Sequence, residues 1–129
     1  MTAFTWEHIH LRSPDPEATA RWYEDMLGAE VIRTKQPDGP ARVDLLLGGG
    51  QKVFVAPANP SLETRPAPDA PYMGLEHIGL TVPDIDAAAS ELKGKGVRFT
   101  MDPTTVRPGV RIAFLRGPEN VSIELIQRG

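Results

Sequence analysis

Residues 75–84 read Leu75-Glu76-His77-Ile78-Gly79-Leu80-Thr81-Val82-Pro83-Asp84, and a second copy of this stretch lies near the N-terminus. Residues 6–15 read Trp6-Glu7-His8-Ile9-His10-Leu11-Arg12-Ser13-Pro14-Asp15. The Glu-His-Ile run, the next Leu and the Pro-Asp pair coincide at a constant offset of 69 positions, as from His8 to His77. Agreement at six positions without a gap indicates two copies of one supersecondary unit.

The length and composition limit what kind of protein this is. A chain of 129 residues predicts one compact domain over residues 1–129. The net charge is −3 with both signs interspersed, so a nucleic-acid partner is not expected. No apolar run is long enough to span a bilayer, and no signal-peptide pattern opens the chain, so we expect a cytoplasmic protein. The absence of cysteine excludes disulfides and thiolate ligands.

Hydrophobic periodicity predicts the same order of elements in both halves, with Asp15 and Asp84 as helix N-caps. We expect an α+β fold with a first βαβββ module at residues 4–57, a Pro-rich linker at 58–74 and a second module at 75–129. The first half has predicted strands at 6–12, 30–33, 42–47 and 52–56 and a helix from 16 to 27. The second half has predicted strands at 75–82, 97–101, 110–116 and 121–127, a helix at 85–95 and a loop at 102–108.

All three histidines lie on the two predicted first strands. Ile78, Leu80 and Val82 share the strand face that packs against the helix, so His77 points to the opposite, concave face. The same alternation on the last strand turns Glu124 to that side. In the first half, His8 and His10 share the concave face by the same argument.

If the two concave faces merge, two or three histidines and one carboxylate converge. Two imidazoles and a carboxylate suit one divalent ion among Fe²⁺, Mn²⁺, Zn²⁺, Ni²⁺ and Co²⁺, and three protein ligands leave positions open for water and substrate. A single strand histidine is more often a surface or core residue. His10 has no counterpart, since Gly79 stands at the equivalent position, and it could be a base, a fourth ligand or a structural residue.

Several stretches resemble the vicinal oxygen chelate superfamily: the His-Ile-x-Leu…Pro-Asp openings, the run 22–28, and residues 111–115 followed by 123–126. This group includes glyoxalase I, methylmalonyl-CoA epimerase, extradiol dioxygenases, fosfomycin-resistance thiol transferases and bleomycin-resistance proteins. The resemblance covers nearly the whole chain outside the linker. It implies two βαβββ modules that form a curled mixed sheet around a central metal cup, a small-molecule substrate and a homodimer.

The resemblance also implies a ligand set. The family places metal ligands on the first and last strands of each module, which here gives His8, His77 and Glu124. His77 and Glu124 are 47 positions apart, and the same step from His8 leads to Val55, which cannot bind a metal. The fourth ligand of glyoxalase I, a glutamate that also moves protons, is therefore missing, and His10 or a water would have to act as the base.

The expected function is a divalent-metal-dependent enzyme acting on a small oxygenated or carbonyl substrate. We expect redox-neutral proton transfer of the isomerase, lyase or epimerase type, with His10 as the catalytic residue that moves the proton. One alternative is an Fe²⁺ extradiol-type dioxygenase, whose signature expects a tyrosine where Phe114 stands, or a Mn²⁺ thiol transferase of the fosfomycin-resistance type. The other alternative is a metal-free drug-binding protein.

Overall fold

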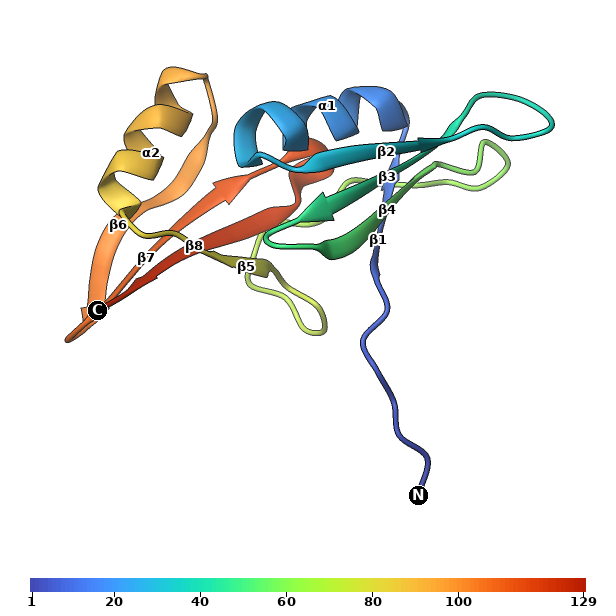
Figure 1. Cartoon of the computed structure of the whole chain (residues 1–129). Helices are drawn as coiled ribbons and strands as arrows, with labels where there is room; N and C mark the ends of the chain where they lie inside the picture. The colour runs from blue at the N-terminus through green and yellow to red at the C-terminus, as the bar shows by residue number, and fades with distance from the viewer. The chain divides into compact units, whose positions relative to one another are not determined.

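The chain, described over residues 1–129 by a computed structural model, contains two compact units, Met1–Thr64 and Arg65–Gly129. Each unit holds one four-stranded sheet with a helix on one of its faces (Figure 1). The α+β fold with two βαβββ modules, predicted from the internal repeat, is confirmed. The division between the units falls inside the predicted linker, and residues 58–77 form neither helix nor strand. No helix in the chain is both long enough and apolar enough to cross a membrane.

The first unit consists of β1 (Ile9–Ser13), α1 (Pro16–Leu27), β2 (Glu30–Thr34), β3 (Arg42–Leu47) and β4 (Gln51–Pro57). The order in the sheet is β1-β4-β3-β2, and β1 runs parallel to β4 while the other neighbours are antiparallel. Helix α1 begins at Asp15, whose Oδ1 accepts a hydrogen bond from Ala18 N at 3.1 Å. The helix ends at Gly28, which adopts the left-handed conformation (φ 68°) that glycine tolerates without strain.

Strict alternation along β3 and β4 places the core of the first unit between sheet and helix. The buried residues on these strands are Val43, Leu45, Leu47, Val53 and Val55, and α1 contributes Ala20 and Tyr23. The intervening residues Asp44 and Phe54 are turned to the opposite face of the sheet. The hydrophobic pattern therefore fixes which polar side chains reach the open face.

The second unit consists of β5 (Ile78–Thr81), α2 (Ile85–Gly94), β6 (Phe99–Arg107), β7 (Val110–Arg116), a short 3₁₀ turn (Pro118–Asn120) and β8 (Ser122–Arg128). The order is β5-β8-β7-β6, with β5 parallel to β8. Asp84 caps α2 by accepting a hydrogen bond from Ala87 N, and Gln127 on β8 accepts another from Ile85 N at 2.8 Å. The core comprises Ile85, Ala89 and Leu92 on the helix and Ala113, Leu115, Ile123 and Leu125 on the strands.

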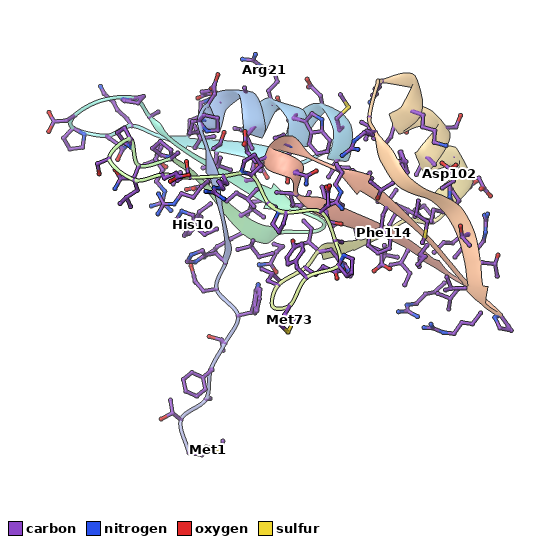
Figure 2. All side chains as sticks on the ribbon, turned by 180° about the vertical axis from the view of Figure 1, so that it is seen from behind. Met1, His10, Arg21, Met73, Asp102 and Phe114 are labelled. Carbon is purple, nitrogen blue, oxygen red and sulfur yellow. The ribbon has the colours of Figure 1, made fainter.

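The predicted start of the first strand at residue 6 is wrong, because pairing with β4 begins only at Ile9, opposite Val53. Strand β4 has just two residues before Val53, so Trp6 has no partner. Phe4 and Trp6 are exposed, and Figure 2 shows Met1 at the far end of an extended N-terminal segment. Strand β5 is likewise shorter than predicted, and both His8 and His77 stand immediately before a strand.

The predicted loop at residues 102–108 is also wrong, because β6 continues to Arg107. The pairing of β6 with β7 shifts register between Met101 and Thr104, so Asp102 and Pro103 lie in an irregular stretch of an otherwise paired strand. Proline is tolerated there because β6 is an edge strand and a bulge removes the need for its missing N–H.

Candidate functional site

The second unit brings two of the predicted metal ligands together. Nε2 of His77 lies 3.5 Å from Oε1 of Glu124, with the two side chains 32% and 20% exposed. Glu124 projects from β8 directly opposite Gly79 on β5, and a Cβ atom at Gly79 would lie 3.5 Å from the same Oε1 atom. A larger side chain than alanine at this position would crowd Glu124, so the glycine leaves the carboxylate room to reach His77.

A second carboxylate orients the His77 ring. Nδ1 of His77 lies 3.0 Å from Oε1 of Glu76. An ionised carboxylate can only accept a hydrogen bond, so Nδ1 carries a proton and donates the hydrogen bond to Glu76. In the neutral ring that has its proton on Nδ1, the lone pair of Nε2 faces Glu124. The ring of Phe114 packs edge-on against His77, with centroids 5.0 Å apart, and holds the imidazole from the side.

This arrangement fits a divalent cation. Two acceptor atoms that face each other without a proton between them repel, and a cation between them removes the repulsion. Donors bound at about 2.1 Å to one tetrahedral ion lie about 3.4 Å apart, close to the separation seen here. The hydrogen bond from Nδ1 to Glu76 is the outer contact that metal-binding histidines commonly make. No group of three or more histidine, aspartate or glutamate side chains in the chain is placed to hold a metal ion, and His8, the third predicted ligand, belongs to the first unit.

In the first unit, His8 and His10 lie side by side, with ring centroids 5.9 Å apart. The ring of His8 stacks on Phe54 at 4.0 Å, and His10 meets the edge of the same phenyl ring at 6.3 Å. The prediction that His8 and His10 share one face is confirmed. Glu7 does not orient His8 as Glu76 orients His77: its Oε1 lies 3.9 Å from Nδ1 of His8 and 3.5 Å from Nζ of Lys52.

The pKa of His10 is lowered, first by its partial burial and then by the positive charges of Arg12, His8 and Arg42. Asp44 acts in the opposite direction, more weakly. The neutral form of His10 is therefore favoured near pH 7, and a neutral imidazole can accept a proton.

The position equivalent to Glu124 in the first unit is Phe54, not Val55. Glu124 pairs with Gly79, and Phe54 pairs with His10, the residue that corresponds to Gly79 in the repeat. Val55 is buried beneath the sheet, as Ile123 and Leu125 are in the second unit. The expectation that counting 47 positions identifies the fourth ligand position is thus wrong by one residue, although Phe54 carries no metal-binding atom either.

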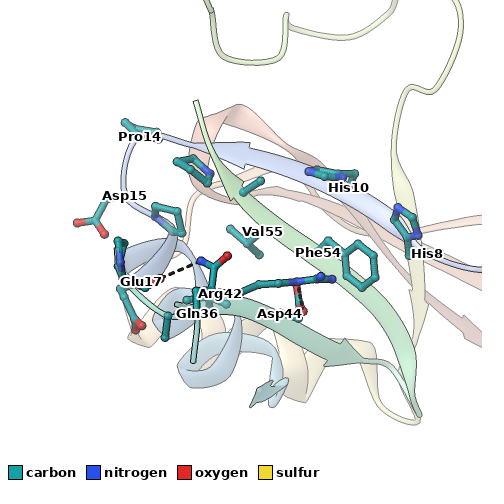
Figure 3. Close-up of a pocket in the computed structure, with 16 residues that line it drawn as sticks. His8, His10, Pro14, Asp15, Glu17, Gln36, Arg42, Asp44, Phe54 and Val55 are labelled. Atoms are coloured by element: carbon teal, nitrogen blue, oxygen red, sulfur yellow. Dashed lines mark hydrogen bonds and ion pairs between the residues drawn. The ribbon is translucent and has the colours of Figure 1, made fainter. Parts of the chain in front are cut away.

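Phe54 and several charged or polar neighbours line a pocket of about 720 Å³ that lies wholly in the first unit (Figure 3). His8 and His10 form part of its wall, together with Arg42 and Asp44 of β3. Nε of Arg42 lies 2.8 Å from Oδ2 of Asp44, and the guanidinium sits 4.5 Å from the centre of the Phe54 ring. Oδ1 of Asp44 is buried without a hydrogen-bond partner.

Three residues near the histidines, Arg42, Asp44 and Glu76, are not among the site residues predicted from the sequence. The sequence does indicate where Arg42 and Asp44 lie: Val43, Leu45 and Leu47 form the core face of β3, which leaves Arg42 and Asp44 on the other face. The signal for Glu76 was its repetition as Glu7 beside His8. Period-two alternation turns neighbouring residues of a strand to opposite faces, but Glu76 and His77 precede β5 and their side chains meet.

Comparison with known proteins finds relatives along nearly the whole chain. Residues 5–125 match the sequence model of the Glyoxalase/Bleomycin resistance protein/Dioxygenase superfamily. The uncharacterized protein YwkD of Bacillus subtilis is 30% identical over 125 residues, which cover 94% of each chain. A probable lactoylglutathione lyase of Vibrio parahaemolyticus is 26% identical, with 93% of this chain and 88% of the relative covered. A probable chloroplastic lactoylglutathione lyase of Arabidopsis thaliana is 25% identical, but this chain spans only 35% of its length.

Solved structures agree on the fold. A glyoxylase/bleomycin resistance protein/dioxygenase domain from Frankia sp. EAN1pec superposes with a TM-score of 0.75 at 21% identity, covering 99% of this chain and all of the other. A superfamily member from Sphaerobacter thermophilus gives a TM-score of 0.70 at 23% identity, covering 95% of this chain and 97% of the other. At these identities the likeness extends to the fold and no further.

Proposed function

The chain belongs to the Glyoxalase/Bleomycin resistance protein/Dioxygenase superfamily, and from that premise we propose that it is a divalent-metal-dependent enzyme of the glyoxalase type. The proposed substrate is a small oxygenated or carbonyl compound. The proposed reaction is redox-neutral proton transfer at a carbon next to a carbonyl, of the isomerase, lyase or epimerase type. The relatives described as probable lactoylglutathione lyases support a lyase of this kind at the level of reaction class.

One observation carries the proposal: the His77–Glu124 pair with Glu76 behind it. Nε2 and Oε1 face each other at 3.5 Å, and the Glu76 hydrogen bond fixes the tautomer that leaves Nε2 free to bind a cation. His8 completes the proposed set of three ligands. A divalent cation held by these residues would supply Lewis acidity that stabilises negative charge on a substrate oxygen.

We assign the proton transfer to His10. The first unit has Phe54 where the second has Glu124, so no carboxylate at that position can act as the base. His10 pairs with Phe54 across the β1–β4 ladder, lines the pocket and has a lowered pKa that favours its neutral form. A neutral imidazole in the pocket wall can take a proton from a bound substrate and return it.

Metal content tests the proposal. Wild-type protein purified without chelator should contain about one divalent ion per chain, measured by inductively coupled plasma mass spectrometry, and His77→Ala and Glu124→Ala should lose it. His10→Ala is the matched control: it removes an imidazole of the same type but should keep the ion. Loss of metal in His10→Ala would make His10 a ligand and contradict its assignment as the base.

The other metal chemistries and the metal-free alternative are separate outcomes of the same experiment. Iron in the purified protein together with oxygen consumption would favour a dioxygenase, and manganese with dependence on added thiol would favour a thiol transferase. A wild type that takes up no metal even after reconstitution would contradict the enzyme proposal and leave a small-molecule binding protein. The homodimer is a further part of the proposal, which light scattering of the purified protein tests.

A further inference from the structure

We infer that the pocket of the first unit binds an organic monocarboxylate with an apolar body, and that Arg42 is the residue that selects the carboxylate. This inference rests on the proposed function, whose substrate class it names. The pocket is the one whose wall His8 and His10 share with Phe54 and with residues of β3.

Arg42 is held in place on two sides. Asp44 pairs with Nε at 2.8 Å, and Phe54 lies under the guanidinium at 4.5 Å (Figure 3). The ion pair occupies Nε and leaves the Nη1 and Nη2 donors of the guanidinium for a ligand. A planar guanidinium whose orientation is already fixed loses little side-chain entropy when it binds, and its paired donors match the two oxygens of a carboxylate.

The electrostatics around Arg42 favour an anion at this end of the pocket. Arg42 lines the pocket, and Nη1 of Arg12 donates a hydrogen bond at 3.1 Å to the carbonyl oxygen of Pro57, another residue of the pocket wall. The other two carboxylates of the pocket wall are already engaged elsewhere: Asp15 caps α1, and Glu17 accepts hydrogen bonds from Arg33.

The same carboxylates limit the ligand to a single negative charge. Asp15, Glu17 and Asp44 all line the pocket, and a phosphate dianion would be repelled by them more than a carboxylate would be. Apart from Gln36 and the two histidines, the rest of the wall is apolar, with Pro14, Pro40, Ala41, Ala56 and Pro57 among its residues. A volume of about 720 Å³ is in the range of pockets that enclose a small organic molecule.

Three matched probes test the inference by NMR titration of the metal-reconstituted protein: 3-phenylpropionate, its neutral amide 3-phenylpropionamide, and 2-phenylethyl phosphate. The carboxylate should bind wild type at least about tenfold more tightly than the amide, because a hydrogen bond to a charged group is lost with the amide. The carboxylate should also bind more tightly than the phosphate. Shift changes should include the amides of His10 and Phe54.

The variant must avoid leaving Asp44 without a partner, since an unpaired buried carboxylate destabilises the fold. We therefore combine Arg42→Met with Asp44→Asn, and expect the preference for carboxylate over amide to fall to within about twofold. Asp44→Asn alone keeps Arg42 and should keep the preference. The matched control combines Arg111→Met with Asp86→Asn, which removes an arginine–aspartate ion pair from the second unit and should leave the preference unchanged.

Several results would overturn the inference: no binding of 3-phenylpropionate to wild type, equal binding of carboxylate and amide, tighter binding of the phosphate, or full selectivity in the Arg42→Met/Asp44→Asn protein. Metal content measured on the same samples separates this inference from the proposed function. Wild type that holds its metal but shows no carboxylate preference contradicts the pocket assignment alone. Carboxylate selectivity in protein that takes up no metal contradicts the enzyme proposal and supports the pocket assignment.

Discussion

Nε2 of His77 lies 3.5 Å from Oε1 of Glu124, and the other nitrogen of the same ring is hydrogen-bonded to Glu76. The His77 ring thus contacts two carboxylates, Glu124 on β8 and Glu76, which precedes β5. The second unit therefore holds together two of the three side chains that we propose as metal ligands. The corresponding glutamate–histidine pair of the first unit, Glu7 and His8, is less tightly held, because Glu7 lies farther from His8 and close to Lys52.

Because Glu76 contacts His77 but is not itself a proposed ligand, a substitution of Glu76 tests the metal site while all proposed ligands are kept. Glu76→Gln removes the charged acceptor of the His77 Nδ1 proton, and loss of such an outer contact weakens metal binding by about 10- to 100-fold. Competition with a chromophoric chelator measures the affinity. Glu91→Gln, on the exposed surface of α2, is the control and should bind metal as wild type does. Unchanged affinity in Glu76→Gln would show that His77 is not a ligand oriented by Glu76.

Phe54 offers the opposite test, a gain of binding. If Phe54 stands at the fourth ligand position, Phe54→Glu adds a carboxylate beside His8, whose ring lies 4.0 Å from the phenyl ring in wild type. Metal affinity should rise by at least about tenfold, since a further charged ligand joins the site. Phe54→Leu keeps an apolar side chain there and should not change the affinity. Equal affinities in the glutamate and leucine variants would contradict this placement.

Asn120 connects the start of the second unit to the turn before β8. Its Nδ2 donates hydrogen bonds to Ala67 O at 2.9 Å and to Asp69 Oδ1 at 3.0 Å, and its backbone has a φ of 61°, which asparagine tolerates better than most residues. Asn120→Ala should lower the free energy of unfolding by about 1–2 kcal/mol. It should also speed proteolysis within residues 65–70. Asn120→Gly separates the contribution of the hydrogen bonds from that of the strained backbone. Glycine relieves the strain at this φ, but both side-chain hydrogen bonds are still lost.

Asp84 is expected to stabilise α2 as an N-cap. Its Oδ1 accepts the Ala87 N–H at 3.0 Å, and Asp84→Ala should cost about 1 kcal/mol in urea unfolding. Asp84→Ser retains a capping oxygen and should cost less. Asp86→Ala provides a contrast, since Asp86 pairs with Arg111 on the surface and caps nothing. A larger loss in Asp86→Ala than in Asp84→Ala would show that the ion pair, and not the cap, stabilises this end of the helix.

The sequence by itself determined the two modules, the bounds of α1 and the face on which His8 and His10 lie. These features depend on local signals: the Asp15 cap, the Gly28 stop and the alternation of apolar residues along each strand. It also predicted that His77 and Glu124 lie together, because the alternation of the apolar residues that follow His77 and flank Glu124 turns both side chains to the same face of one half. Such signals need no knowledge of which strands become neighbours.

Only the tertiary structure decided which residue of the first unit matches Glu124. His77 and Glu124 are 47 positions apart, whereas His8 and Phe54 are 46 positions apart. Side chains alternate along a strand with a period of two, so a difference of one residue in the intervening segments moves the match from a core residue to one on the open face. The pairing of strands, and not the count along the chain, also brought Arg42, Asp44 and Phe54 into one pocket wall with His10.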